Sequence, residues 1–128
     1  MQPKYPLFVR AKDSGELASF NSVYELQTHV EKIDIENREY EAWDSDGFRL
    51  ALSLQAPVWL NLGIDAERPD PEDLDRALHQ FASSVGVKLP DRLSPGTIQS
   101  TLAQIRNEYD KQAVEGSRIR RFFAHFKH

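Results

Sequence analysis

The chain of 128 residues contains no cysteine and no long apolar run. Without cysteine there can be no disulfide bridge, thiolate zinc site, iron–sulfur cluster or cysteine nucleophile. The longest stretch without a charged residue is 50–64, which Pro57 interrupts. A membrane-spanning helix needs about 20 apolar residues, and the first residues lack the apolar stretch of a signal peptide. We therefore expect a soluble cytoplasmic protein with no membrane segment.

Motifs for catalysis and cofactor binding are also missing. The sequence has no glycine-rich phosphate loop, dinucleotide fingerprint, nucleophile elbow or zinc helix motif. Residues 44–47 resemble part of a calcium loop, but that alignment puts Ala42 and Ser53 where carboxylates are required. His125 and His128 have metal-ligand spacing but no third ligand nearby. We expect no catalytic residue, metal or cofactor.

Charge is divided unevenly along a chain of otherwise ordinary globular composition, with 40% hydrophobic and 28% charged residues. Residues 1–75 carry 7 Lys/Arg and 16 Asp/Glu, a net charge of −9, and residues 76–128 carry 9 and 4, a net charge of +5. This asymmetry indicates either partners of opposite charge or docking of one half on the other. The length predicts a single domain, 1–128, with a sheet and a helix in 1–62 and a helical part in 71–128.

A first β-hairpin is predicted from residues 5–11 and 16–20, which flank an Asp-Ser-Gly turn at 13–15. A three-residue loop with glycine in the left-handed position is a common hairpin closure. It would create two favourable cross-strand pairs: Phe8 with Phe20, and Lys12 with Glu16.

One helix is predicted after this hairpin. Ser22 is a candidate N-cap, and Glu25 three residues later completes a capping box. Apolar residues then recur with helical spacing, and they are Val23, Leu26, Val30 and Ile33. The helix should end near Asp34.

A second hairpin is predicted over 39–54. Its second strand alternates apolar and other residues, with Phe48, Leu50, Leu52 and Leu54 on one face. A three-residue loop at 45–47 keeps apolar residues opposite each other, pairing Tyr40 with Leu52 and Ala42 with Leu50. This register places Trp43 beside Arg49 on the other face, where the two can form a cation–π pair.

The remaining elements are a short strand and helices. Pro57 precedes a strand over 58–62, which is expected at a sheet edge, and residues 63–70 are expected to form a linker. Asp70 caps a helix that Gly86 ends. Its apolar face is Leu74, Ala77, Leu78, Phe81, Ala82 and Val85.

A last helix is expected to begin at Ser94-Pro95 and either to pause at Gly116 or to continue through Phe126. Its inward residues would be Ile98, Leu102, Ile105 and Tyr109. The predicted fold class is α+β: an antiparallel sheet of about five strands built from two hairpins, with one helix between them and two or three C-terminal helices. Strands followed by helices favour helices on one face of the sheet.

Acidic residues concentrate between Glu31 and Asp46, which indicates either a surface for a cationic partner or a solvated face. The predicted partner-binding residues are Glu36, Glu39, Glu41, Trp43, Asp44 and Asp46. Trp43 is either an exposed hot spot or a residue covered by the helix over 71–86 or by the C-terminal tail. A second acidic group lies in 65–75, where the start of a helix explains several of the charges.

The C-terminal tail has the opposite charge, with basic residues and phenylalanines but no acid. Such a segment suits nucleic acid, a membrane surface or a partner helix, whereas its helical spacing favours core packing or a homodimer interface. The candidate contacts are Arg118, Arg120, Arg121, Phe122 and Lys127.

The block over 22–47 contains the pattern ID-x-E-N-x-E-Y followed by D-x-x-G. The matching residues are Ile33, Asp34, Glu36, Asn37, Glu39, Tyr40, Asp44 and Gly47. This block resembles small single-domain bacterial proteins of unknown function. The resemblance covers about the first 60 residues, and it implies a bacterial, cytoplasmic setting.

We expect a non-catalytic protein-interaction domain that binds a basic protein partner through its acidic surface, with a profile like that of immunity or antitoxin proteins. Nucleic-acid binding through the tail is an alternative, and a small ligand-binding module or enzyme with an acidic pocket is another. Homodimerisation through the C-terminal helices is compatible with all three.

Overall fold

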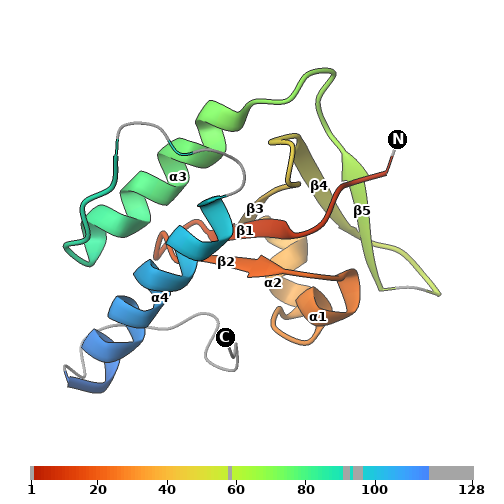
Figure 1. Ribbon diagram of the computed structural model, residues 1–128. Coiled ribbons are helices and arrows are strands. Elements are labelled where there is room, and N and C mark those ends of the chain that lie inside the picture. Colours follow the sequence, from red (N-terminus) through yellow and green to blue (C-terminus); the bar gives the residue numbers. More distant parts are fainter. Residues whose placement is uncertain (1, 58, 91–92, 94–96, 116–128) are drawn as a thin grey trace.

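The computed structural model describes residues 2–57, 59–90, 93 and 97–115, which Figure 1 shows as an antiparallel sheet with helices. The elements are β1 (Leu7–Ala11), β2 (Leu17–Phe20), α1 (Val23–Gln27), α2 (Lys32–Glu36), β3 (Tyr40–Trp43), β4 (Arg49–Leu54), β5 (Leu60–Ile64), α3 (Pro71–Ser84) and α4 (Ile98–Glu115). Within these residues the five strands form one sheet in the order β2-β1-β3-β4-β5. The predicted α+β class is confirmed.

Helices cover both faces of the sheet, so the prediction that they share one face is wrong. Helices α1 and α2 pack on one side, and α3 and α4 lie on the other (Figure 1). Each side has its own core: Leu7, Val9 and Phe20 belong to the first, and Phe8 and Leu17 to the second. Both faces of β1 and β2 are therefore buried, as in a three-layer arrangement.

The register of the first hairpin differs from the prediction by one residue. Phe8 lies opposite Ser19, and Leu7 lies opposite Phe20. The turn also begins one residue earlier, because the N–H of Ala11 donates to the carbonyl of Glu16 at 2.9 Å. A hydrophobic pattern selects a register only when one face is polar. Since both faces of these strands carry large apolar residues, with Phe8 and Leu17 on the face that also holds Arg10 and Ser19, the sequence pattern could not distinguish the two registers.

The single helix predicted between the hairpins is two short helices, α1 and α2. The predicted N-cap is confirmed: Ser22 Oγ accepts the N–H of Glu25 at 3.0 Å. At the end of α1, Thr28 Oγ1 donates to the carbonyl of Glu25 at 2.8 Å, and His29 Nδ1 lies 2.8 Å from the same oxygen. Side chains that take a backbone carbonyl in this way compete with helix propagation.

The break between α1 and α2 changes the apolar stripe. Ile33, predicted to face inward, is 59% exposed, whereas Ile35 is buried. A single helix would have kept Val30 and Ile33 on one face. The chain restarts at α2 with a different face toward the sheet, so the prediction for Ile33 is wrong.

Helix α3 agrees with the prediction, and the second hairpin agrees with it near the tip, whereas the predicted pair of Tyr40 with Leu52 does not form because β3 and β4 diverge beyond Ala42. Ala42 pairs with Leu50, and Trp43 pairs with Arg49. Helix α3 starts after Asp70, whose side chain accepts the N–H of Asp73. The whole predicted apolar face of α3 is buried. Strand β5 does lie at the sheet edge, but it starts two residues later than predicted and includes Gly63 and Ile64.

Helix α4 packs against α3 and β2. All four predicted inward residues, Ile98, Leu102, Ile105 and Tyr109, are buried. The predicted start at Ser94-Pro95 and the two alternatives beyond Gly116 lie outside the described residues.

A buried ion pair joins the first hairpin to α4. Arg106 Nη1 lies 2.9 Å from Glu16 Oε1, and the two side chains are only 1% and 0% exposed. The same nitrogen donates to the carbonyl of Leu17 at 3.2 Å. Because both charges are removed from water, the loss of either side chain would leave the other as an unpaired buried charge and destabilise the fold.

Candidate functional site

Asp44 organises the tip of the second hairpin. Its side chain is 1% exposed. Oδ1 accepts the N–H groups of Asp46 and Phe48 at 2.9 and 3.0 Å, and Oδ2 accepts the N–H of Lys4 at 3.1 Å. A carboxylate that accepts nearby backbone donors stabilises a turn. Asp44 therefore has a structural role and does not present a charge to a partner.

Trp43 is buried beneath α3, with 1% of its surface exposed. The indole Nε1 donates to Asp73 Oδ2 at 3.0 Å. The guanidinium carbon of Arg49 lies 5.2 Å from the ring centroid, which confirms the predicted cation–π pair. The alternative in which helix 71–86 covers this face is also confirmed, and the interpretation of Trp43 as an exposed hot spot is wrong.

Glu41 lies between two arginines. Its carboxylate oxygens are 2.6 Å from Arg10 Nη1 and 2.9 Å from Arg49 Nη1, and the latter nitrogen also lies 2.8 Å from Asp73 Oδ2. Burial alone would raise the pKa of Glu41, but the hydrogen bonds and charges of the two arginines outweigh burial and lower it. Glu41 is thus an ionised part of a network that joins three strands to α3.

Glu36 and Glu39 lie at the other end of β3 from the hairpin tip. Glu36 is exposed at the end of α2, and Glu39 is half-buried. Next to them, burial raises the pKa of Tyr40, and the Asp34 carboxylate, which accepts the Tyr40 hydroxyl at 3.3 Å, raises it further. The Tyr40 hydroxyl is therefore neutral across the physiological range. The six predicted residues do not form one continuous patch.

Asp46, the remaining predicted residue, borders a groove at the hairpin tip. The tip touches the start of α3: the N–H of Asp70 donates to the carbonyl of Gly47 at 2.9 Å. Gly47 has φ +86, and a Cβ there would come within 2.8 Å of the Pro71 backbone. This glycine permits a close approach that no other residue allows.

The groove has a volume of about 370 Å³ and lies between this tip, the first turns of α3 and the start of α4. Its acidic lining residues are Asp46, Glu72 and Asp75, and its apolar lining residues are Pro71, Leu74, Leu93 and Ile98. One carboxylate oxygen of Asp75, Oδ1, is buried and lies 3.6 Å from His79 Nδ1. We refer to it as the acidic groove. Sequence reasoning explained Glu72 by the helix start and did not connect it with Asp46, because only the contact between tip and helix brings them together.

The structure tests the expectations for the C-terminal tail, for a metal site and for a membrane segment only in part. The basic tail contacts at Arg118, Arg120, Arg121, Phe122 and Lys127 lie outside the described residues, as do His125 and His128. Across the described part of the chain, no three His, Asp or Glu side chains are grouped to hold a metal ion. None of the helices described there combines the length and apolar character needed to cross a bilayer.

Comparison with known proteins gives no assignment. No protein-family model matches the chain. No curated protein and no solved structure matches it either. The resemblance of residues 22–47 to small bacterial proteins stays a prediction, and the function is inferred from the residues of this chain alone.

Proposed function

We propose that the chain is a protein-interaction domain, rather than an enzyme, and that the acidic groove binds a basic segment of a partner protein. The observation that carries this proposal is the combination of three acidic residues with four apolar residues in the lining of one groove of about 370 Å³. The small, acidic chain without cysteine or a catalytic motif has a profile like that of immunity and antitoxin proteins, and a bacterial, cytoplasmic setting accords with it.

The chemistry of the groove suits lysine and arginine side chains. These have an apolar stem and a charged head, so the stem can lie on Pro71 and Leu93, which are accessible in the groove, while the head meets a carboxylate. Glu72 is exposed, and Asp46 Oδ2 lies 3.1 Å from Lys4 Nζ, with the two side chains 44% and 70% exposed. Exposed pairs of this kind contribute little stability, so an incoming cation can replace Lys4 at low cost.

The charge of the surrounding chain favours the same partner. Residues 1–75 carry a net charge of −9, and the groove draws on this acidic half for every carboxylate in its lining. Rim charges of one sign speed the approach of an oppositely charged partner and make association sensitive to salt.

The test is an NMR titration of the isotope-labelled chain with an unlabelled peptide of alternating arginine and leucine. Saturable shifts are expected at Gly47, Leu74 and Ile98. A triple variant that carries Asp46→Asn, Glu72→Gln and Asp75→Asn should bind the peptide at least about tenfold more weakly, since each lost charged contact lowers the affinity several-fold.

A matched variant removes the same charge elsewhere. It carries Asp13→Asn, Glu31→Gln and Glu36→Gln, all at exposed positions outside the groove. Unchanged affinity of this variant supports the groove. Equal weakening by both triples would reduce the effect to net charge and overturn the proposal, and so would shifts confined to the surface around Glu36.

A further inference from the structure

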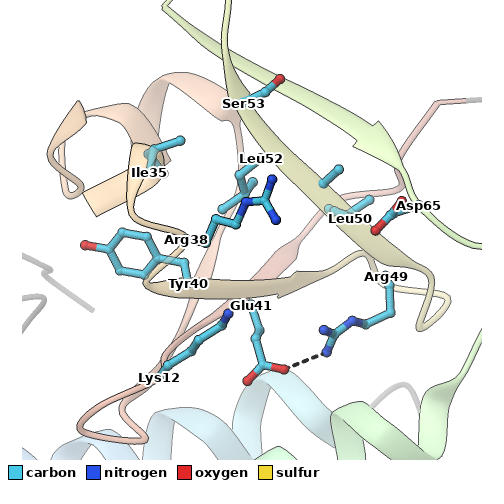
Figure 2. A pocket seen from close by; sticks show the side chains of 11 residues that line it. Lys12, Ile35, Arg38, Tyr40, Glu41, Arg49, Leu50, Leu52, Ser53 and Asp65 are labelled. Carbon is cyan, nitrogen blue, oxygen red and sulfur yellow. Dashed lines mark hydrogen bonds and ion pairs between the residues drawn. The ribbon is translucent and has the colours of Figure 1, made fainter. Parts of the chain in front are cut away.

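Strands β3 and β4 separate soon after the hairpin tip. They pair only at Ala42↔Leu50 and Trp43↔Arg49, whereas β4 and β5 pair along the whole length of β5. Beyond Ala42 the two strands diverge and leave a pocket of about 430 Å³ (Figure 2). Pockets for small molecules typically have about 300–1,000 Å³, so a small ligand fits this gap.

The backbone of β4 presents polar groups to this gap. The N–H of Asp65 donates to the carbonyl of Arg49, and the N–H of Gln55 donates to the carbonyl of Trp59. Antiparallel strands alternate the side to which their peptide groups point. Odd-numbered residues of β4 therefore bond to β5, and the peptide group of Leu52 faces the diverging β3.

Three cations from three segments line the pocket: Lys12 from the first hairpin loop, Arg38 from the turn after α2, and Arg49 from β4. They gather in the half of the chain that has a net charge of −9. Arg49 is paired with Glu41 and Asp73. The side chains of Lys12 and Arg38 make no ion pair or hydrogen bond with any other residue in the described ranges.

Arg38 occupies a backbone position that favours glycine. Its φ is 55°, in the left-handed region, and it is the one described residue other than glycine with a positive φ. The turn closes α2, with the N–H of Glu39 donating to the carbonyl of Asp34 at 3.0 Å. A glycine would meet this requirement with less strain, so the presence of arginine indicates a use for its side chain.

The rest of the lining suits the body of an organic molecule. Ile35, Leu50 and Leu52 give the pocket an apolar part, and Figure 2 shows the Arg38 side chain extending from the α2 side toward Leu52. Glu41 is already neutralised by its arginine partners. Asp65, on the opposite side of the pocket from Lys12 and Arg38 in this view, can accept a hydrogen bond from a hydroxyl or amine group.

We propose that this pocket binds a small molecule with a phosphate or carboxylate group, which Lys12 and Arg38 hold while Leu50 and Leu52 contact its apolar body. Guanidinium groups match the geometry of phosphate and carboxylate oxygens, and such charge-assisted hydrogen bonds are strong. The pocket shares no residue with the acidic groove, so the proposal does not depend on partner binding.

The experiment is a titration of the full chain with phenyl phosphate, phenylacetate and inorganic phosphate at about 0.15 M salt, where exposed charges are screened beyond about 8 Å. Amide shifts and calorimetry report binding. We expect saturable binding with shifts at Arg38, Leu52 and Ser53. Phenyl phosphate should bind more tightly than inorganic phosphate because its ring meets the apolar wall. The comparison with phenylacetate separates a phosphate site from a carboxylate site.

Arg38→Gly is the decisive variant, because glycine suits the left-handed backbone and the loss of the cation cannot be confused with unfolding. Arg38→Gly and Lys12→Gln should each weaken phenyl phosphate binding by about tenfold. Lys88→Ala removes an exposed cation outside the pocket and should change nothing. The acidic-groove triple variant should bind phenyl phosphate as the wild type does.

Two outcomes would overturn the proposal. One is the absence of saturable binding of all three probes. The other is equal weakening by Lys88→Ala and Arg38→Gly, which would show attraction to overall charge rather than a site.

Discussion

The buried pair of Glu16 and Arg106 gives the sharpest test of the fold. We consider Arg106→Met, which keeps much of the side-chain volume and removes the charge. The guanidinium is 2.9 Å from the carboxylate, and both side chains are essentially inaccessible to water. Removing one member of such a pair leaves the other charge buried, at a cost of about 3–5 kcal/mol.

This cost is large enough to measure by thermal unfolding. For 128 residues the entropy of unfolding near 60 °C is about 270 cal/mol/K. A loss of about 3–5 kcal/mol therefore lowers the melting temperature by about 11–18 °C. Circular dichroism during heating and urea unfolding should give the same loss.

The double variant Glu16→Leu with Arg106→Met separates pairing from burial. Replacing both charges by apolar groups is often neutral or stabilising, so this variant should be more stable than Arg106→Met alone. Arg76→Met is the exposed control. The Arg76 side chain, which pairs with Asp73, is 63% exposed, so this ion pair should contribute less than about 1 kcal/mol to stability. Additive losses in the double variant would refute the reasoning.

Three further predictions concern single residues. Gly47→Ala should lower the free energy of unfolding by about 2 kcal/mol or more, because the new Cβ would lie 2.8 Å from the Pro71 backbone. Gly15→Ala should lower it by only about 1 kcal/mol, since Gly15 has φ +75 but nothing lies within 4 Å of its Cβ position. Equal losses for the two variants in urea unfolding would contradict this. Arg38→Gly should stabilise the chain by about 0.5–1 kcal/mol through relief of its left-handed φ, and a lower melting temperature would contradict it. The pKa of Glu41 is lowered from its ordinary value of 4.5, so its stabilisation is present above that pH and is lost as the pH falls through the lower, folded-state pKa. Glu41→Gln should therefore lose less stability than the wild type between about pH 5 and 3, measured by urea unfolding at each pH.

Local signals predicted part of the fold well. Helix α3 carries an N-cap at Asp70, proline at its first position, a complete apolar face and Gly86 with φ +78 at its end. Each of these acts within a few residues. The register of the second hairpin near its tip was equally predictable, because its loop and the apolar alternation of β4 both favour the same register, but the divergence of the strands beyond Ala42 was not.

Other features depended on contacts that the sequence does not display. The register of the first hairpin was ambiguous because β1 and β2 carry large apolar residues on both faces. The second of these faces is buried because α3 and α4 pack against it. The helix break after α1 follows from Thr28 and His29, which bond the carbonyl of Glu25. Val30 and Ile33 are spaced as in one continuous helix, so the sequence pattern did not indicate the break.

The sequence by itself determined the acidic and basic halves of the chain, the α+β class and the tip of the second hairpin, because composition and short-range pattern decide these. Only the tertiary structure decided which charges are available to a partner. It buried Trp43 and Asp44, paired Glu41 with two arginines, and left Asp46 in a groove with residues of α3. It also brought Lys12 and Arg38 to one pocket. Residues distant in sequence meet only where strands diverge and helices pack, so the position of a site depends on packing as much as on residue type.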